Sequence, residues 1–404
     1  MTRDDARARD AADPLRAYRD RFALPEGVIY LDGNSLGPLP CATASALSDM
    51  VARQWGDRLI RSWNEGWIDA PQRIGGKIAR LIGAHADEVI VADSTSVNLF
   101  KLLVAALRHD PARHTIVSET GNFPTDLHIA EGAIGCVPGA RLKAVARGDL
   151  HDGIDHDTAV TLLTHVHYKT GERYDMAQWT ARAHDAGALA LWDLSHSVGA
   201  IDVDLNGAGA DLAVGCGYKY LNGGPGAPAF LFVSRKLQDR LANPLSGWMG
   251  HAAPFAFADA YAPADGMTRW LAGTPPMLAM AGLEAGVDLW LDIDRAHVAA
   301  KSAALFDLLA AIGAELGLEC VSPANPAERG SHISFRHPHA YALCQALIAR
   351  GVIGDFRDPD ILRFGLTPLY LGYEDVWRAG EILGEILASE AHADPEFSKR
   401  NAVT

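Results

Sequence analysis

A lysine and an aspartate are the residues of this 404-residue sequence best suited to chemistry. Asp193 ends the apolar run 189–193, and Lys219 follows a further apolar run, 212–214, in small and apolar surroundings. Lysine is rarely buried without a reason, and burial lowers the pKa of an amine, which favours attack on a carbonyl carbon. We therefore predict that Lys219 forms a Schiff base.

Each of these two residues also has an ordinary alternative. Asp193 could cap the next helix, and Lys219 could be a solvated loop residue. In the functional interpretation, Asp193 faces the pyridine nitrogen of pyridoxal phosphate and keeps it protonated, so that the ring acts as an electron sink. An aspartate and a lysine after successive strands favour the cofactor interpretation more than either residue does alone.

The segment 93–96 (DSTS) is a candidate phosphate site, because it lies between an apolar run and a helical pattern that begins with Val97. Backbone N–H groups at a helix N-terminus attract anions, and the hydroxyls of Thr95 and Ser96 add donors. Serine and threonine also cap ordinary helices, so this motif has two interpretations.

The segment 123–126 (FPTD) follows another apolar run and opens a helical pattern. Phe123 could stack on the pyridine ring, with Asp126 at the same edge of the sheet. Alternatively, Phe123 forms a hydrophobic staple and Asp126 is an ordinary residue of the first helical turn.

Short apolar runs alternate with helical patterns between residues 85 and 235, which predicts an α/β fold with a mostly parallel sheet. Ligands of such sheets bind at the carboxyl ends of the strands, where the residues above are expected. The expected strands lie at residues 88–91, 115–117, 161–164, 189–193, 212–214 and 230–233.

The rest of the chain predicts a second, smaller α+β domain. A helical pattern near 276–312 precedes expected strands at 333–335 and 362–364 and expected helices at 340–350 and 373–389, while the first 40 residues resemble an arm with a short strand at 28–31. We expect an N-terminal arm and small-domain segment over 1–40, a large cofactor-binding domain over 41–285 and a small C-terminal domain over 286–404.

The composition excludes several classes of partner. With 49% apolar and 21% charged residues the chain is typical of globular proteins, and a net charge of −14 disfavours nucleic acids and anionic membranes. The five cysteines show no C-x-x-C spacing, so we expect buried thiols rather than zinc or disulfides. The amino terminus has no apolar signal-peptide stretch, and no window reaches about 18 apolar residues, so a cytoplasmic protein is expected.

Seven motifs, in order along nearly the whole chain, resemble those of bacterial kynureninases, a family of pyridoxal-phosphate enzymes of fold type I related to class V aminotransferases. The motifs are residues 30–37 (YLDGNSLG), 122–126 (NFPTD), 193–196 (DLSH), 218–226 (YKYLNGGPG), 247–251 (GWMGH), 329–335 (RGSHISF) and 363–370 (RFGLTPLY).

The resemblance implies hydrolysis of L-kynurenine to anthranilate and L-alanine in tryptophan catabolism and pyridine nucleotide biosynthesis. The 3-hydroxy analogue of kynurenine is the alternative substrate. The resemblance also implies a seven-stranded sheet in the large domain and a homodimer whose active site lies between subunits.

The resemblance further implies a role for each matching residue. Lys219 would hold the cofactor through a Schiff base, and Tyr218 would donate a proton or hold the phosphate. Arg363 would bind the substrate α-carboxylate, and Trp63 and Thr274 would select the aniline ring. The other residues expected at the cofactor are Thr95, Ser96, Phe123, Pro124, Thr125, Asp126, Thr164, Asp193 and His196, with Trp248 and Thr274 contributed by the second subunit.

Two residues depart from the family pattern, because members often carry alanine where Ser195 stands and asparagine where His167 stands. His165 and His167 form an H-x-H pair on an expected strand, but no third ligand has metal-binding spacing. A cysteine desulfurase would share the fold and the lysine but generally has glutamine at position 196 and histidine at 218. A nicotinamide oxidoreductase would need a glycine fingerprint at the first strand–helix turn, and a cofactor-free binding protein is the third alternative.

Overall fold

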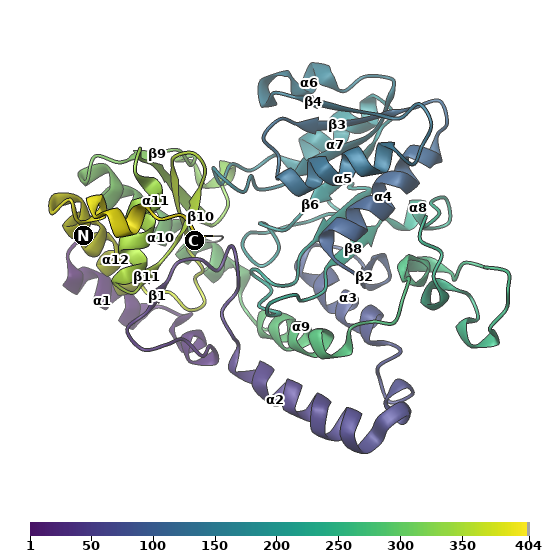
Figure 1. Cartoon of the computed structure of the whole chain (residues 1–404), viewed down its shortest axis with the longest axis horizontal. Helices are drawn as coiled ribbons and strands as arrows, with labels where there is room; N and C mark the ends of the chain where they lie inside the picture. Colours follow the sequence, from purple (N-terminus) through teal and green to yellow (C-terminus); the bar gives the residue numbers. More distant parts are fainter. Residues whose placement is uncertain (402–404) are drawn as a thin grey trace. The chain divides into compact units, whose positions relative to one another are not determined.

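The computed structural model describes residues 1–401 and divides into two compact units (Figure 1). The large unit comprises Thr43–Val166 and Tyr174–Leu291. The small unit combines Met1–Ala42, His167–Arg173 and the described residues from Asp292 onward. The small unit is therefore assembled from three separate stretches of chain.

The large unit contains a seven-stranded sheet. Its strands run in the order β2 (Val89–Val91), β8 (Phe230–Val233), β7 (Leu212–Gly215), β6 (Leu189–Asp193), β5 (Thr158–Thr164), β3 (Thr115–Glu119) and β4 (Arg141–Val145). The five strands from β7 to β4 are parallel, whereas β8 is antiparallel to both neighbours. This confirms the predicted mostly parallel sheet. Strand β4 was not expected because it is a partly exposed edge strand with two basic residues.

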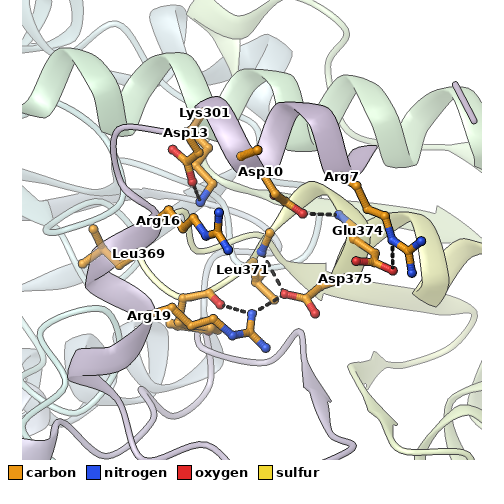
Figure 2. A pocket seen from close by; sticks show the side chains of 13 residues that line it. Arg7, Asp10, Asp13, Arg16, Arg19, Lys301, Leu369, Leu371, Glu374 and Asp375 are labelled. Atoms are coloured by element: carbon orange, nitrogen blue, oxygen red, sulfur yellow. Dashed lines mark hydrogen bonds and ion pairs between the residues drawn. The ribbon is translucent and has the colours of Figure 1, made fainter. Parts of the chain in front are cut away.

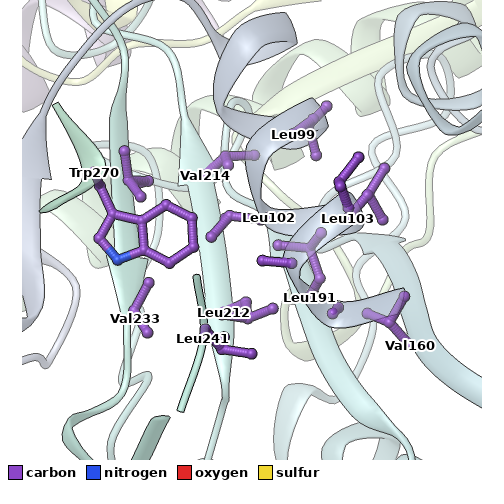
Figure 3. Packing of buried hydrophobic residues seen from close by; sticks show 14 of the residues in the cluster. Leu99, Leu102, Leu103, Val160, Leu191, Leu212, Val214, Val233, Leu241 and Trp270 are labelled. Carbon is purple, nitrogen blue, oxygen red and sulfur yellow. The ribbon is translucent and has the colours of Figure 1, made fainter. Parts of the chain in front are cut away.

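Helices pack on strands of this sheet. The longer ones are α3 (Ala70–Leu81), α4 (Thr95–His109), α5 (Pro124–Ile134) and α7 (Met176–Asp185), and α9 (Met277–Trp290) packs on α3. Figure 3 shows how Leu99, Leu102 and Leu103 of α4 face the buried side chains of Leu191 and Leu212. Their i, i+3, i+4 spacing places one apolar face of α4 on the sheet.

The small unit contains an antiparallel sheet in the order β12 (Asp355–Arg357), β13 (Ile361–Gly365), β10 (His332–Arg336) and β9 (Glu319–Cys320). Strand β1 (Ile29–Tyr30) pairs in parallel with β11 (Val352–Ile353). The helices are α1 (Arg3–Ala12), α10 (Arg295–Glu315), α11 (Ala340–Ala349) and α12 (Tyr373–Ala388). This is the predicted smaller α+β fold.

Charged side chains attach the N-terminal arm to α12 within the small unit. Figure 2 shows Arg7 directed at Glu374, with 3.0 Å between Nε and Oε1, and Lys301 directed at Asp13. The carboxylate of Asp10 accepts the backbone N–H groups of Tyr373 and Glu374 at the start of α12. A pocket of about 500 Å³ lies among these groups.

The expected helix over 276–312 is wrong, because the structure has two helices there. Helix α9 ends at Trp290, and α10 begins at Arg295 after Asp294, whose side chain accepts the N–H of Ala296 at 2.9 Å. The segment between them is flanked on both sides by apolar helical patterns, so periodicity alone did not reveal the break. The aspartate N-cap is the signal that marks it.

Helix α10 also corrects the expectation about membrane spans. It is long and apolar enough to cross a membrane by length and composition, and it is the one helix among residues 1–401 that meets this test. However, 44% of its most apolar window is buried inside the protein, and α10 packs against α12 and β10. Core helices pass the same test, so one such helix is weak evidence for a span.

The cysteines differ from the expectation of buried thiols. Cys216 and Cys344 are buried, but Cys41, Cys136 and Cys320 are exposed. All five are free thiols.

Candidate active site

Lys219 lies in the loop between β7 and β8 and is only 9% exposed. Its Nζ atom is 3.0 Å from Nε2 of His196 and 5.8 Å from the centre of the Phe123 ring. The Tyr218 ring centre is 5.9 Å away. The loops after three different strands therefore place an imidazole and two aromatic rings around one buried amine.

Asp193 ends β6 and is the direct register partner of Thr164, which ends β5. Its Oδ1 accepts the backbone N–H of Ser195 at 2.7 Å, so the carboxyl group is fixed by its own turn. Burial raises the pKa of Asp193 above its usual value, with Ser195 and Lys219 opposing the shift. In residues 194–211, which the structure describes in full, no helix lies between β6 and β7, so this contact belongs to a turn and is not the helix cap that the sequence offered as an alternative.

Asp126, in the first turn of α5, lies beside Asp193. Its pKa is raised well above the usual value by burial and by the charge of Asp193. The hydroxyl of Thr164 is 3.1 Å from Asp126 Oδ2 and 2.5 Å from Oδ1 of Asn122. Asp126 and Asp193 thus lie together in the protein interior, and Lys219 is the cation near both.

The predicted phosphate segment opens α4, which begins at Thr95 and not at Val97 as expected. Ser94 is the N-cap, and its Oγ accepts the N–H of Val97 at 3.3 Å. Thr95 and Ser96 occupy the first helical turn and are half-buried. This arrangement suits an anion, because backbone N–H groups of a first helical turn point away from the helix.

Lys101 also belongs to this region, although it was not predicted from the sequence. Its Nζ lies 2.7 Å from Oδ2 of Asp93 and 2.8 Å from the carbonyl oxygen of Trp270, and its side chain is fully buried. Asp93 has a left-handed backbone, with φ of 48°. A lone lysine within the apolar run of α4 was the available signal, since buried lysines require partners.

Tyr218 is half-buried beside Lys219. Burial raises the pKa of its phenol, and the neighbouring Cys216 and Asp193 add to the shift. The phenol therefore keeps its proton at neutral pH.

Three residues expected at the cofactor or the substrate lie in more open parts of the large unit. Trp63 packs edge-on against Trp67, with ring centres 5.6 Å apart, and Trp248 packs edge-on against Phe255. Thr274 is exposed. In the described part of the chain, none of the three shares a hydrogen bond or ring contact with Lys219.

Arg363 belongs to the small unit and is 1% exposed. Both its Nε and Nη2 atoms donate to the carboxylate of Asp355, the former at 2.8 Å, and Nη1 donates to the carbonyl oxygen of Tyr168. The guanidinium of Arg363 is thus held by the carboxylate of Asp355 on the neighbouring strand, β12.

The expectation that His165 and His167 lie on a strand is wrong. Strand β5 ends at Thr164, and the two histidines belong to different units. His165 packs edge-on against Trp192, while His167 Nδ1 lies near the backbone N–H groups of Lys169 and Thr170. Residues 1–401 contain no group of three metal-ligating side chains.

The residues around Lys219 fit pyridoxal phosphate. A carboxyl group that burial holds away from water, as at Asp193, is stabilised in its charged form by a pyridinium nitrogen. The amine of Lys219 lies close enough to the same group for one aromatic aldehyde to meet both residues, and Phe123 offers a face for stacking.

The fold is that of known pyridoxal-phosphate enzymes. Cysteine desulfurase from Thermococcus onnurineus NA1 matches with a TM-score of 0.80 at 19% identity, covering 92% of this chain and 98% of that one. A C-DES variant with glycine covalently linked to its PLP cofactor matches with a TM-score of 0.79 at 16% identity, over 90% of this chain and 98% of that one. This likeness concerns the fold.

Sequence comparison separates this chain from the desulfurases. The family model "Kynureninase C-terminal domain" matches residues 298–383. Kynureninase from Pseudomonas fluorescens is 52% identical, and kynureninase from Burkholderia mallei (strain SAVP1) is 51% identical, each over 100% of both chains. The motifs, the fold and full-length identity above one half agree, and the chain belongs to the kynureninase family.

Proposed function

We propose that Lys219, Asp193 and Tyr218 carry out the reaction of the family in this chain. As a kynureninase, the enzyme uses pyridoxal phosphate to cleave L-kynurenine hydrolytically between Cβ and Cγ, giving anthranilate and L-alanine. The observation that supports these residue roles is the 3.0 Å contact between Lys219 and His196 beside the buried Asp193.

Lys219 anchors the cofactor and then moves protons. When bound, pyridoxal phosphate supplies a ring that accepts the electrons left at Cα. Lys219 Nζ removes the Cα proton, because an amine displaced from the cofactor stays within reach of that carbon. His196, hydrogen-bonded to Nζ, holds the amine in place.

Asp193 keeps the pyridine nitrogen protonated. The walls around the ring are formed by Asp126, Thr164 and Phe123. Thr95, Ser96 and Tyr218 hold the phosphate end, with Pro124 and Thr125 lining the same edge at the start of α5. Because the phenol pKa of Tyr218 is raised by burial, this residue keeps a proton to donate. We assign Tyr218 to protonation of the alanine carbon released by Cβ–Cγ cleavage.

Arg363 binds the α-carboxylate of the substrate, since a guanidinium fork matches two carboxylate oxygens. Trp63 and Thr274 contact the aniline ring and favour kynurenine over its 3-hydroxy analogue. The ratio of the two substrates' kcat/KM values measures this preference, and a ratio favouring the hydroxylated substrate contradicts it.

The enzyme acts as a homodimer in which Trp248 and Thr274 reach the cofactor site of the second subunit. Its support is a set of exposed apolar side chains on the large unit, among which Trp248, Phe255 and Phe257 pack on one another, because exposed apolar clusters mark protein–protein contacts. Ile60 is 76% and Phe257 80% exposed, and the others are Val51, Trp55, Leu59, Trp248, Phe255 and Leu278. Five free thiols support a cytoplasmic location.

One experiment tests the anchor and the reaction together. The purified chain with pyridoxal phosphate and L-kynurenine is expected to release anthranilate and L-alanine in equal amounts, and borohydride to fix the cofactor on Lys219. Lys219→Ala should lose both, whereas Lys101, the other buried lysine of the large unit, should remain unlabelled. Labelling on Lys101, or full activity of Lys219→Ala, contradicts the assignment.

A further inference from the structure

Two guanidinium groups share one carboxylate in the small unit. Asp355 Oδ2 accepts from Nη2 of Arg357 at 2.8 Å and also from Nη2 of Arg363, while its Oδ1 accepts from Nε of Arg363. The hydroxyl of Ser35 donates to Asp355 Oδ2 at 2.7 Å and accepts from both arginines. Burial opposes the charge of Asp355, but the guanidiniums outweigh it and hold the pKa at about 2. Asp355 is therefore ionised.

A second carboxyl group, that of Asp32, lies against this cluster. Asp32 lies between Leu31, whose backbone N–H donates to the carbonyl oxygen of Ile353 at 2.7 Å, and Ser35, whose hydroxyl donates to Asp355. The Oδ1 atom of Asp32 is buried without a hydrogen-bond partner among residues 1–401, and burial and the charge of Asp355 raise the pKa of Asp32. Two neighbouring carboxyl groups away from water do not both ionise readily, because their negative charges repel each other strongly. The guanidiniums hold Asp355 ionised, so the proton resides on Asp32.

The protonation of Asp32 decides the net charge of the cluster. With Asp32 neutral, two positive guanidiniums face one negative carboxylate, and one positive charge remains. With Asp32 ionised, the cluster is neutral. A substrate α-carboxylate carries one negative charge, which only the first state matches.

We propose that Asp32 is a positioning residue that keeps its proton and thereby leaves one positive charge in the Arg357–Arg363 cluster for the substrate carboxylate. This inference rests on the proposed role of Arg363 in binding that carboxylate. Asp32 acts through the arginines and does not contact the substrate itself.

The groups around Asp32 set the pH at which this charge is lost. Burial and Asp355 raise the pKa of Asp32 to about 8, while Arg363 and Ser35 oppose the shift. The pKa values of Tyr30 and Cys344 are both raised, chiefly by burial, so neither titrates near pH 8. The charged and titratable groups that face Asp32 are Tyr30, Cys344, Asp355, Arg357 and Arg363.

The test is the pH dependence of kcat/KM for L-kynurenine, measured with the holoenzyme of wild type and of Asp32→Asn. Above pH 8 the wild type should lose up to about tenfold in kcat/KM per pH unit through a rising KM, whereas the asparagine variant cannot ionise. The ratio of variant to wild type should therefore rise by up to about tenfold between pH 7 and 9. Tyr30→Phe, the matched control, should follow the wild-type profile.

A ligand without the carboxylate charge separates this role from a structural one. The carboxamide of kynurenine is used as a competitive inhibitor, and its Ki should show no pH-dependent difference between wild type and Asp32→Asn. A ratio that stays flat with kynurenine, or that rises equally with the carboxamide, overturns the proposal. Asp32→Ser is a second neutral variant if the asparagine does not fold.

The Arg363→Lys variant distinguishes a wrong role for Arg363 from a wrong role for Asp32. If Arg363→Lys keeps the wild-type KM for kynurenine, Arg363 does not bind the carboxylate, and the proposed function is wrong at that residue whatever Asp32 does. If Arg363→Lys raises KM at least about tenfold while the Asp32→Asn ratio stays flat, only the role of Asp32 is wrong.

Discussion

The Nε2 atom of His196 lies 3.0 Å from Nζ of Lys219, and this contact joins the turn after β6 to the loop after β7. The imidazole therefore orients the amine that we propose as the cofactor anchor. His196→Ala should lower kcat/KM by about 10- to 100-fold and weaken cofactor retention, measured by dialysis and absorbance. His196→Gln, which keeps a polar atom near the amine, should lose less. Equal losses in both variants count against the contact.

Tyr218→Phe tests the proton donor. Since burial keeps the phenol protonated, removing its hydroxyl should lower kcat by about 10²- to 10⁴-fold while the cofactor absorbance stays. Steady-state rates and a spectrum of the same sample measure both effects. A variant that loses the cofactor instead indicates that the hydroxyl holds the phosphate, and a fully active variant contradicts both roles.

Asp193→Asn removes the charge that we propose keeps the pyridine nitrogen protonated. Because an unprotonated ring is a poorer electron sink, kcat should fall by at least about 10²-fold. Exchange of the substrate Cα proton, followed by NMR in heavy water, should slow by a similar factor. Asp126→Asn is the matched control at the adjacent acid and should lose less, since its pKa is raised and it carries less charge. Unchanged exchange in Asp193→Asn speaks against the assignment.

The sequence predicted the positions of Asp193 and Lys219 because an apolar strand that ends in a polar residue fixes where that residue lies in a parallel sheet. It also predicted the sheet itself, apart from the partly exposed edge strand β4. It did not predict the pairing of Arg363 with Asp355, since neighbouring antiparallel strands bring the two together only after the sheet forms. Nor did periodicity reveal the break between α9 and α10, where both sides are apolar.

Lys101 shows the same limit, because its partner Asp93 can be identified only from the structure. Replacing this fully buried lysine leaves Asp93, which is 28% exposed, without its cation. Lys101→Met should therefore destabilise the large unit. The cost should be about 3 kcal/mol, at the low end for a broken buried pair, because Asp93 is partly exposed. Urea unfolding of the apoenzyme measures the loss. Lys143→Met, at an ion pair in the same unit whose two side chains are both partly exposed, should cost about 1 kcal/mol or less. Equal costs refute the special role of Lys101.

The raised pKa of Asp32 also predicts how stability depends on pH. The folded state holds the proton up to about pH 8, whereas the unfolded chain releases it near pH 4. The stabilisation from neutral Asp32 is thus complete below pH 4 and is lost as pH rises to about 8. Asp32→Asn lacks this loss, so its Tm relative to wild type should rise across this window. The rise should be about 2–4 °C for each kcal/mol of unfolding free energy that the wild type loses. Thermal unfolding of both proteins at pH 5, 6.5 and 8 measures the difference. A constant Tm difference over these pH values means that Asp32 is already ionised in the folded enzyme, and the positive charge proposed for the carboxylate site is then absent.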